Sequence, residues 1–548
     1  MKKITTLLSS IAIFCATIAS AQQKAPYSFS HELSEKAPQT LMPNRDFTKD
    51  IADAIAFEEA GNYPIFAHHF DLSITMENAG VWTTLENGDR IWRINLKSKG
   101  AMSSCFFFEN FYLPEGSTLH AYSTDHSKVY TYDFESNQGN DLFSTEFMIA
   151  EEQVLEYYEP IAAKGKGRMR ITAMSHQFRS IRMAGACEIN IICSPEGDNW
   201  QNEKKGVVRI YVVAGGGAGW CTGTLMNNTA LDCKRYILTA WHCGQQSSAT
   251  NLNQYKFRFN YDATSCFASD TDGTTNNEFT GCTKRADSND NGGATGSDFL
   301  LLEMTSTSSP SWWATTAYFN GWTKSTSASS GGGVCIHHPA GSNKKVSTYS
   351  NTPTSVSWGG SVSSTHWEIK WIATVNDWGV TEGGSSGSAV YNSAGLVFGT
   401  LTGGNSACNN QSAGDAYGKI SYHWTSNGTT ANRQLKPWLD PGNTNVTTLA
   451  SGYTICNSTG VSTIKLDDEI KIYPNPSSGI FTLSFLGNAH ENKIRVMNVM
   501  GQEVQNFTIE QSSSNEYSID LSTQGNGLYF IEVNGNGKII SKKVSVLK

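Results

Sequence analysis

The chain has 548 residues, enough for roughly three or four domains of ordinary size. Only 16% of the residues are charged, and the net charge of -8 gives no reason to expect a nucleic-acid partner. Beyond the first 21 residues no segment is apolar for long enough to cross a membrane. No Cys or His spacing indicates a metal site, and no motif indicates a cofactor.

Residues 1–21 predict an export signal. Lys2 and Lys3 precede an apolar run from Leu7 to Ile18, and Ala19-Ser20-Ala21 supplies a small-residue cleavage pattern. A membrane anchor is the alternative, but the run is too short to span a bilayer. Export permits disulfides, and most of the 12 cysteines lie between residues 187 and 456.

Residues 22–182 predict a mostly β N-terminal domain that acts as a propeptide. Alternating aromatic runs at 90–94 and 128–132 indicate strands. The basic, Gly-rich segment 164–170 is expected to be exposed and cleavable. A second basic cluster, residues 179–182, precedes the cysteine-rich region, so we expect processing near Arg182.

Residues 183–456 predict an all-β middle domain, because short apolar runs alternate with Gly, Asn and Ser clusters. Runs at 206–213, 236–240 and 395–399 are examples, and one helix is expected near 432–439. Residues 457–467 resemble a linker. Residues 468–548 form a small β-module, with strands expected at 470–473, 480–483, 494–497 and 528–533.

Three segments of the middle domain suggest acyl-transfer chemistry. An apolar run ends at His242, Asp298 opens another, and Ser386 lies in the Gly-rich stretch 381–388. Serine is a weak nucleophile unless a histidine takes its proton, and a buried carboxylate must orient that histidine. The order His, Asp, Ser is that of chymotrypsin-type proteases, the system on which the general triad description rests.

The oxyanion of the tetrahedral intermediate needs fixed donors, and we assign them to the amides of Gly384 and Ser386. Each of the three motifs also has a purely structural explanation. A His beside a Cys is often structural, a Gly-Ser cluster is usually a loop, and Asp before an apolar strand is common. The joint occurrence of all three in one cysteine-rich β-domain favours catalysis.

The middle domain resembles bacterial lysyl endopeptidases, which are secreted trypsin-like serine proteases. The motifs that carry the resemblance are CEINIIC at 187–193, PEGD at 195–198, CTGTL at 221–225, NNTA at 227–230, His242-Cys243, SDF at 297–299, IHHP at 336–339, VTE at 380–382, SSGS at 385–388 and WLDP at 438–441. The resemblance implies a chymotrypsin-like double β-barrel with the active site in the cleft between the barrels.

The same resemblance implies three disulfides and two substrate-binding residues. The implied pairs are Cys187–Cys408, Cys193–Cys266 and Cys221–Cys243. It gives no partner for Cys233, Cys282, Cys335 or Cys456. Asp415 would lie at the base of the primary pocket and pair with a substrate lysine, since an unpaired buried carboxylate would be costly. A turn aspartate is the alternative.

Trp358 matches the tryptophan that the family has near its active site, but the usual histidine partner is replaced by Thr402. This departure leaves the preference for Lys over Arg open. Ser385 stands before the nucleophile where vertebrate trypsins have aspartate, so activation by a new N-terminal amine is not expected. The propeptide would instead aid folding or block the site.

The last 80 or so residues resemble a type IX secretion sorting domain. The motifs are IYPNPSSG at 472–479, VMGQ at 499–502 and GLY at 527–529, followed by a basic end. This resemblance implies a small β-sandwich that directs export and is then removed. A carbohydrate-binding or adhesive β-module is the alternative, although no aromatic platform supports it.

We therefore expect a secreted, monomeric serine endopeptidase that cleaves proteins and peptides after basic residues, Lys preferred. Its partners would be those substrates, its own propeptide and the type IX export machinery. Alternatives are an inactive trypsin-fold binding or adhesion protein and a protease of different specificity. The pairs His68-His69 and His337-His338 are poor chelates, because neighbouring residues on a strand face opposite ways.

Overall fold

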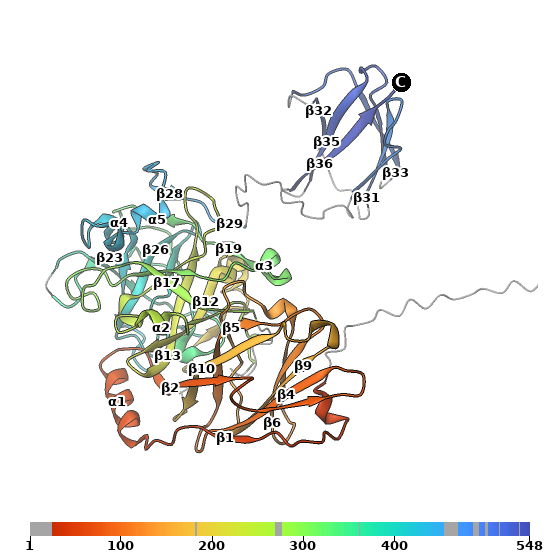
Figure 1. The fold of residues 1–548 in the computed structure, drawn as a ribbon. Helices are drawn as coiled ribbons and strands as arrows, with labels where there is room; N and C mark the ends of the chain where they lie inside the picture. Colours follow the sequence, from red (N-terminus) through yellow and green to blue (C-terminus); the bar gives the residue numbers. More distant parts are fainter. Residues whose placement is uncertain are drawn as a thin grey trace, which may run out of the picture. The chain divides into compact units, whose positions relative to one another are not determined.

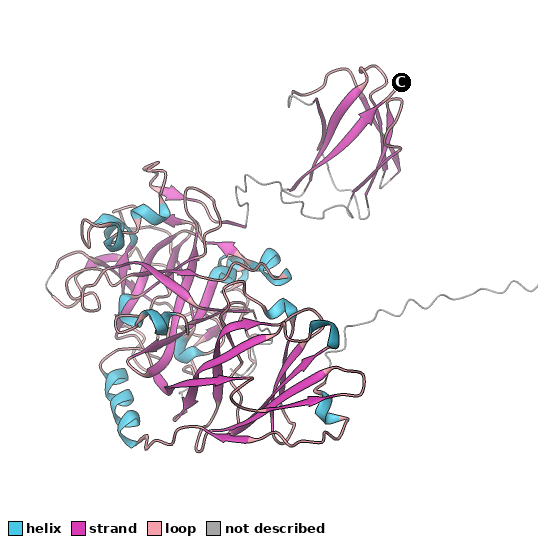
Figure 2. Ribbon diagram, viewed as in Figure 1, coloured by secondary structure: helices cyan, strands magenta, loops and turns pink. Residues whose placement is uncertain are grey.

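The computed structural model describes residues 25–180, 183–268, 277–360, 362–453, 470–485, 493–498, 502–513, 516–535 and 538–548. Strands are the main secondary structure of these residues and the helices are short (Figures 1 and 2), so the expected all-β class is confirmed. The chain divides into two compact units, residues 1–457 and 458–548. The expected export signal and linker lie outside the described residues.

The N-terminal domain contains helix α1 (Thr48–Glu59) and a six-stranded sheet in the order β1-β4-β9-β6-β7, with β3 beside β4. Its strands are β1 (Gln39–Leu41), β3 (Val81–Thr84), β4 (Arg90–Lys97), β6 (Thr118–Ser123), β7 (Val129–Tyr132) and β9 (Glu152–Glu159). The strands expected at 90–94 and 128–132 are thus confirmed. Trp92 and Tyr157 are buried in an aromatic core beneath this sheet.

A second, eleven-stranded sheet crosses from the N-terminal domain into the middle domain in the order β16-β15-β12-β13-β2-β10-β5-β8. The N-terminal domain supplies β2 (Ile65–Thr75), β5 (Ser104–Tyr112), β8 (Phe143–Ser144) and β10 (Arg168–Gln177). The middle domain supplies β12 (Val207–Ala214), β13 (Gly217–Met226), β14 (Tyr236–Thr239), β15 (Lys256–Arg258), β16 (Glu278–Thr280), β17 (Cys282–Asp287) and β18 (Leu300–Met304).

Segment 164–170 is mostly exposed, as expected, but it runs into a strand of this sheet. Its first residues lie in an exposed turn, as expected, but Arg168 and Arg170 open strand β10. β10 pairs with β2 on one side and β5 on the other. Alternate residues of this strand, Met169 and Ile171, are buried, so the apolar period overrides the basic and Gly-rich composition.

The other half of the middle domain is a ten-stranded sheet in the order β11-β22-β21-β25-β26-β27-β24-β23, with β20 beside β26 and β28 beside β20. Its strands are β11 (Ile189–Asn190), β20 (Trp322–Thr323), β21 (Gly333–His337), β22 (Lys345–Tyr349), β23 (Thr354–Val356), β24 (His366–Lys370), β25 (Ala389–Asn392), β26 (Val397–Gly404), β27 (Gly414–Lys419) and β28 (Thr448–Leu449). The middle domain thus has two β-lobes, as a chymotrypsin-like fold requires, although among the described strands both sheets stay open.

Short elements join and cover the lobes. They are β19 (Tyr318–Phe319), paired with β29 (Gly452–Tyr453), and the helices α2 (Ala249–Leu252), α3 (Ser311–Thr316), α4 (Ile420–Thr425) and α5 (Lys436–Leu439). Helix α5 is the second half of the helix expected near 432–439; a 3-10 turn at Ala431–Arg433 precedes it.

The second unit is a small β-sandwich, drawn in blue in Figure 1. One sheet has the order β30-β31-β34-β33 and the other β32-β35-β36, around a core that includes Phe481, Val496 and Ile531. Their bounds are β30 (Ile470–Tyr473), β31 (Ile480–Phe485), β32 (Lys493–Asn498), β33 (Thr508–Ser513), β34 (Glu516–Asp520), β35 (Gly527–Gly535) and β36 (Lys538–Val546). The four expected strands are confirmed, and β33, β34 and β36 add to them.

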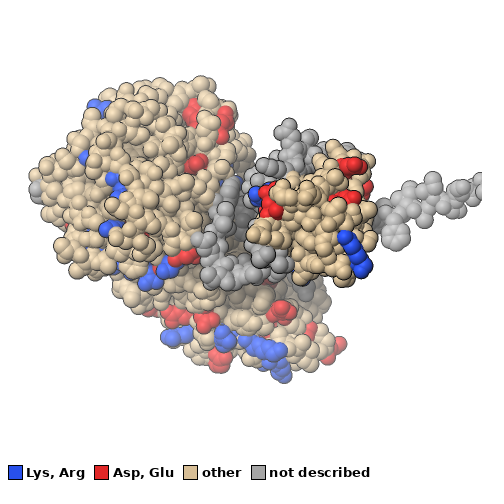
Figure 3. Space-filling view, turned by 90° about the horizontal axis from the view of Figure 1, so that it is seen from above, with Lys and Arg blue, Asp and Glu red and all other residues tan. Residues whose placement is uncertain are grey.

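Three disulfides are formed as expected: Cys187–Cys408, Cys193–Cys266 and Cys221–Cys243. Cys233 is also disulfide-bonded, whereas Cys105, Cys282 and Cys335 are free and buried; Cys456 lies outside the described residues. Within the described part of the chain, no helix has the length and apolarity to cross a membrane. Figure 3 shows only scattered charges on one face of the molecule, in keeping with the low charged fraction.

Candidate active site

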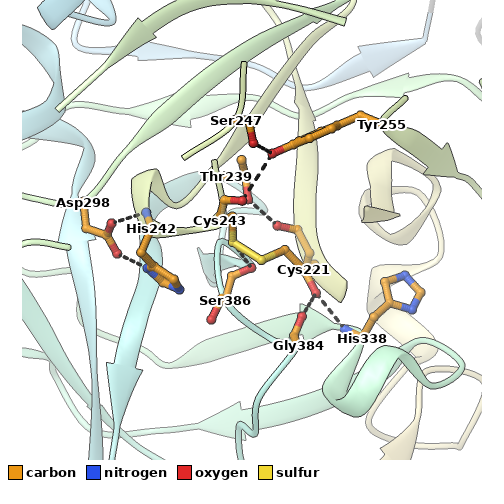
Figure 4. Close-up of a disulfide and its surroundings, with 11 residues drawn as sticks. Cys221, Thr239, His242, Cys243, Ser247, Tyr255, Asp298, His338, Gly384 and Ser386 are labelled. Atoms are coloured by element: carbon orange, nitrogen blue, oxygen red, sulfur yellow. Dashed lines mark hydrogen bonds and ion pairs between the residues drawn. A yellow bond between two sulfur atoms is a disulfide. The ribbon is translucent and has the colours of Figure 1, made fainter. Parts of the chain in front are cut away.

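Strand pairing brings two of the three proposed catalytic residues together. β14 and β18 are antiparallel, with Thr239 opposite Leu300. His242 lies just after the end of β14, and Asp298 lies just before the start of β18. The two side chains therefore meet: Nδ1 of His242 lies 2.8 Å from Oδ2 of Asp298, and the N–H of His242 donates to Oδ1 at 3.0 Å (Figure 4).

A second carboxylate, Asp290, lies directly against Asp298. Asp298 is fully buried and has a positive φ of 59°, and its N–H donates to Oδ2 of Asp290 at 2.7 Å. The other oxygen of Asp290 accepts the N–H of Gly293 at 3.1 Å. Sequence reasoning missed Asp290, because it lies in an Asn- and Gly-rich stretch where an aspartate is typical of a turn.

These carboxylates set the charge balance of the imidazole. Burial by itself would lower the pKa of His242, but the charge and hydrogen bond of Asp298, with a smaller effect of Asp290, hold it above its ordinary value. Burial, and then the charge of Asp298, raise the pKa of Asp290. The imidazole is therefore a stronger base than an exposed histidine.

Ser386 lies in a loop that is hydrogen-bonded to three strands, β13, β26 and β21. The N–H of Thr222 on β13 donates to the carbonyl of Ser386 at 2.9 Å, and its hydroxyl donates to the carbonyl of Gly384 at 2.9 Å. The N–H of Gly387 donates to the carbonyl of Leu401 on β26 at 2.9 Å. Ser385 completes the anchoring: its hydroxyl lies 2.8 Å from Nδ1 of His337 on β21.

The hydroxyl of Ser386 lies on the side of the imidazole that faces away from Asp298 (Figure 4). Nε2 of His242 is buried and has no hydrogen-bond partner among the described residues. Asp298 and His242 are thus hydrogen-bonded, whereas no hydrogen bond joins His242 to the hydroxyl of Ser386. Such bonds are commonly long before substrate binds and tighten afterwards.

The backbone around Ser386 offers free donors. Gly384 has a φ of +97°, and a Cβ there would lie 3.0 Å from the backbone of Ala340, Gly341 and His338, so only glycine fits. The N–H groups of Gly384 and Ser386 donate to no other residue that the structure describes. Two unpaired amides one residue apart beside a serine hydroxyl form a suitable oxyanion site.

Asp415 lies on β27 and is 1% exposed. Its Oδ2 accepts from Nε1 of Trp371 at 2.6 Å, from the hydroxyl of Thr381 at 2.7 Å and from the hydroxyl of Ser406 at 2.6 Å. Among the described residues, its Oδ1 accepts only the N–H of Ser406, at 3.1 Å. Burial raises its pKa in spite of these donors. Sequence reasoning found Asp415 but none of the residues that hold it.

Trp358 lies close to a histidine that the sequence did not single out. The ring of His366 on β24 is 6.2 Å from that of Trp358, and its Nε2 lies 3.0 Å from the hydroxyl of Thr402. Burial lowers the pKa of His366 to about 4, so it is neutral. A histidine from β24, two strands away in the sheet, thus lies beside Thr402, which replaces the usual family histidine.

The four histidines weighed as metal ligands have other surroundings. His337 bonds the hydroxyls of Ser385 and Ser347, and Nδ1 of His338 lies 2.8 Å from the carbonyl of Ser342. Both rings are fully buried, and His337 supports the Ser386 loop through its bond to Ser385. His68 lies near Asp50, and burial lowers the pKa of its neighbour His69 to about 3.

Comparisons with known proteins match two separate parts of the chain. Residues 181–418 match the family model "Lysyl endopeptidase, C-terminal domain", and residues 471–547 match "Secretion system C-terminal sorting domain". A curated relative, the lysyl endopeptidase of Pseudomonas aeruginosa, is 30% identical over 240 residues, which are 41% of this chain and 46% of the relative. The chain thus spans about half the length of that relative.

Solved structures of serine proteases are similar at lower identity. The protease Anisep from Arthrobacter nicotinovorans is 14% identical, with a TM-score of 0.29, over 40% of this chain and 91% of its own. A Glu endopeptidase is 15% identical, with a TM-score of 0.27, over 44% and 95%. The family matches bear out both resemblances: residues 181–418 are similar to the lysyl endopeptidase C-terminal domain, and residues 471–547 are similar to the secretion system sorting domain.

Proposed function

We propose that this protein is an exported serine endopeptidase that cleaves proteins and peptides after basic residues, with His242, Asp298 and Ser386 as its catalytic triad. The observation that carries the proposal is the buried pair of His242 and Asp298, with a serine in a glycine-rich loop on the other side of the imidazole. The lysyl endopeptidase match over residues 181–418 supports the same chemistry.

In the first half of the reaction, Nε2 of His242 takes the proton of the Ser386 hydroxyl as the oxygen attacks the peptide carbonyl. The negative charge on the carbonyl oxygen is stabilised by the free amides of Gly384 and Ser386. The imidazolium then gives its proton to the leaving amine, the C–N bond breaks, and an acyl-enzyme ester remains.

In the second half, water attacks the ester and His242 takes a proton from it. The second tetrahedral intermediate uses the same two amides, and the imidazolium returns the proton to Ser386 as the acid product leaves. Asp298 keeps its charge throughout: it fixes Nδ1–H of the imidazole and stabilises the imidazolium.

Primary specificity is assigned to Asp415. Three donors converge on its Oδ2, whereas Oδ1 accepts one amide from the residues that the structure describes and keeps a lone pair for a cation. A neutral substrate side chain would leave this buried carboxylate without a counter-charge, which favours Lys or Arg. The match to lysyl endopeptidases favours Lys, and Trp358 would line the neighbouring substrate subsites.

The C-terminal sorting domain marks the chain as an exported, surface-associated protein. We propose that the type IX export machinery is the partner of that domain, that residues 22–182 are the propeptide, and that the enzyme is a monomer. The boundary between the propeptide and the catalytic domain, residues 183–456, is the one that the sequence analysis predicts.

Labelling with a fluorophosphonate tests the proposal directly, because this probe reacts only with an activated serine. The wild type and a Ser393→Ala control, which changes an exposed serine in the turn after β25, should label equally. Ser386→Ala should not label. A wild-type protein that takes no label after processing would favour the alternative of an inactive binding protein.

A further inference from the structure

The motif IHHP at 336–339 takes no part in the chemistry proposed above, although both of its histidines are fully buried. His337 ends β21, and a 3-10 turn, Pro339–Gly341, follows directly after the motif's second histidine. Both pieces contact the loop that carries Ser386, His337 through its ring and the turn through its backbone. The motif therefore lies where it can fix the shape of that loop.

The directions of the hydrogen bonds decide which nitrogen of His337 carries the proton. The hydroxyl of Ser347 lies 3.0 Å from Nε2 of His337 and 2.9 Å from the carbonyl of Val380. A carbonyl only accepts, so this hydroxyl donates to Val380 and accepts from Nε2–H. The carboxylate of Glu188 lies 3.6 Å from Nε2 and favours a proton on the same nitrogen. Nδ1 of His337 is therefore an acceptor.

The hydroxyl of Ser385 donates to this acceptor. It lies 2.8 Å from Nδ1 of His337, and it also accepts the N–H of Glu382 at 3.1 Å. Burial, and then the charge of Lys345, lower the pKa of His337 to about 3, so the ring is neutral and Nδ1 keeps its lone pair. One imidazole thus joins two hydroxyls, one bonded to the backbone of Val380 and the other to the backbone of Glu382.

Backbone bonds in the same loop set the direction of the two amides assigned to the oxyanion site. In a trans peptide the carbonyl and the next N–H point opposite ways. The carbonyl of Gly383 accepts the N–H of Ala340 at 2.7 Å, and the carbonyl of Ser385 accepts the N–H of Ser388 at 2.9 Å. The N–H groups of the following residues, which are the two proposed oxyanion donors, therefore point away from these partners.

The second histidine of the motif holds the peptide between the two donors. The hydroxyl of Thr222 accepts the N–H of His338 at 3.0 Å and donates to the carbonyl of Gly384 at 2.9 Å (Figure 4). A Cβ on Gly384 would lie 3.0 Å from the carbonyl of His338, so the two segments are in close contact. The IHHP segment and its turn thus fix three consecutive residues of the loop, 383–385.

We propose, on the basis of the proposed function, that His337 and Ser385 are positioning residues for the oxyanion site. Their hydrogen bond holds residues 382–386 in the shape that presents both amides to the substrate carbonyl. Both side chains are fully buried, so neither touches substrate. Loss of the bond therefore weakens the binding of the charged tetrahedral intermediate, whereas the triad and the pocket of Asp415 keep their contacts.

The kinetic test uses Ser385→Ala in the full-length protein after its normal processing. We expect kcat for a chromogenic lysine peptide to fall about 10- to 100-fold, because a displaced oxyanion donor loses much of its effect. KM and the pH midpoint should change little, because neither the pocket nor His242 is altered. Ser306→Ala is the matched control: this buried hydroxyl donates to the carbonyl of Gln138 at 3.0 Å. Unchanged kcat in Ser385→Ala, or an equal loss in the control, overturns the proposal.

Two inhibitors separate the oxyanion site from the pocket. A peptidyl lysine aldehyde forms a tetrahedral adduct with Ser386 and should bind Ser385→Ala about 10- to 100-fold more weakly than wild type. Butylamine carries only the cation that the pocket of Asp415 would take, so it should inhibit both proteins equally. If the two inhibitors weaken by the same factor, Ser385 supports the whole site and the proposal is wrong.

Two replacements of His337 separate hydrogen bonding from packing. His337→Asn keeps an acceptor for the Ser385 hydroxyl and should retain most of kcat, whereas His337→Leu fills the space without an acceptor and should lose as much as Ser385→Ala. The double variant of His337→Leu and Ser385→Ala should be no slower than either single variant, because all three lack the same bond. Equal rates for the Asn and Leu variants contradict the proposal. If His337→Leu does not fold, Ser347→Ala, which removes the partner of Nε2–H, takes its place.

The position of the imidazole proton gives a readout that does not depend on activity. In full-length Ser386→Ala with nitrogen-15-labelled histidine, the ring signals of His337 are those that His337→Asn removes. They should show a neutral ring with its proton on Nε2, and a proton on Nδ1 would overturn the proposal. If the wild type hydrolyses no lysine peptide and takes no fluorophosphonate, the proposed function fails. The ring signals then still decide whether His337 accepts the bond from Ser385.

Discussion

Asp290 accepts the backbone N–H of Asp298 at 2.7 Å, so the buried carboxylate of Asp290 holds the backbone of Asp298 in place. Asp298 has a positive φ, which costs free energy for a residue other than glycine. The bond to Asp290 stabilises this conformation, and the conformation points both oxygens of Asp298 at His242. Asp290 is thus a positioning residue for the proposed triad.

Replacing Asp290 by alanine should therefore lower kcat about 10- to 100-fold, as the loss of a charged hydrogen bond worth about 1.5–3 kcal/mol requires. KM for a lysine peptide should change little, because Asp290 makes no contact with the pocket of Asp415 among its described bonds. Steady-state kinetics measure both quantities. The exposed carboxylate Asp198, changed to Asn, is the control, and an equal loss there would contradict the positioning role.

The pH dependence of kcat/KM should follow His242. Its pKa lies above the ordinary value of 6.5, because Asp298 and Asp290 outweigh the effect of burial. The base must be neutral to take the proton, so activity should fall as pH decreases, with a midpoint above pH 6.5. Asp290→Asn removes one negative charge and should move this midpoint to lower pH. A wild-type midpoint below 6.5, or an upward shift in the variant, would contradict this reasoning.

The sequence singled out the residues that would carry the chemistry of the proposed site, but not the residues that support them. His242, Asp298 and Ser386 each stand at a strand end or in a glycine-rich loop, which local patterns mark. His366 and Trp371 support Thr402 and Asp415 from other segments, and their partners depend on tertiary packing. No local pattern marks such a partner.

The same limit applies to the fold. Apolar and aromatic runs predicted some of the strands, such as β4, β12 and β14, since such a run favours a buried strand and is visible in the strand's own sequence. The pairing of β2 with β13 joins residues about 150 positions apart in two expected domains. Nothing in either strand identifies the other, because main-chain hydrogen bonds carry no sequence signal.

Asp415→Asn should reduce cleavage after lysine selectively. The amide keeps the size of the carboxylate but offers no counter-charge, so kcat/KM for a lysine peptide should fall about 100- to 1000-fold, as for a buried ion pair that loses one partner. A panel of chromogenic peptides ending in Lys, Arg, Glu and Phe measures this change. Trp371→Phe removes one donor to Oδ2 and should cause a smaller loss on the same peptides. An unchanged Lys preference in Asp415→Asn would place the specificity determinant elsewhere.

The disulfide Cys221–Cys243 joins β13 to the residue after His242, and Sγ of Cys243 lies 3.8 Å from the carbonyl of Ser386 (Figure 4). It closes a loop with a sequence separation of 22, so its removal should lower the free energy of unfolding by about 3 kcal/mol. Because it fixes the base, its replacement by two alanines should also lower kcat.

Cys193–Cys266 is the matched control for that variant. Its sequence separation is 73, so removing it should cost slightly more stability, about 4 kcal/mol. It joins segments that make no described bond to His242 or Ser386, so kcat should stay unchanged at temperatures where the protein is folded. Denaturant unfolding and peptide hydrolysis measure the two effects separately. If both variants lost kcat in proportion to their stability, Cys221–Cys243 would act on the fold as a whole and not on the position of the imidazole.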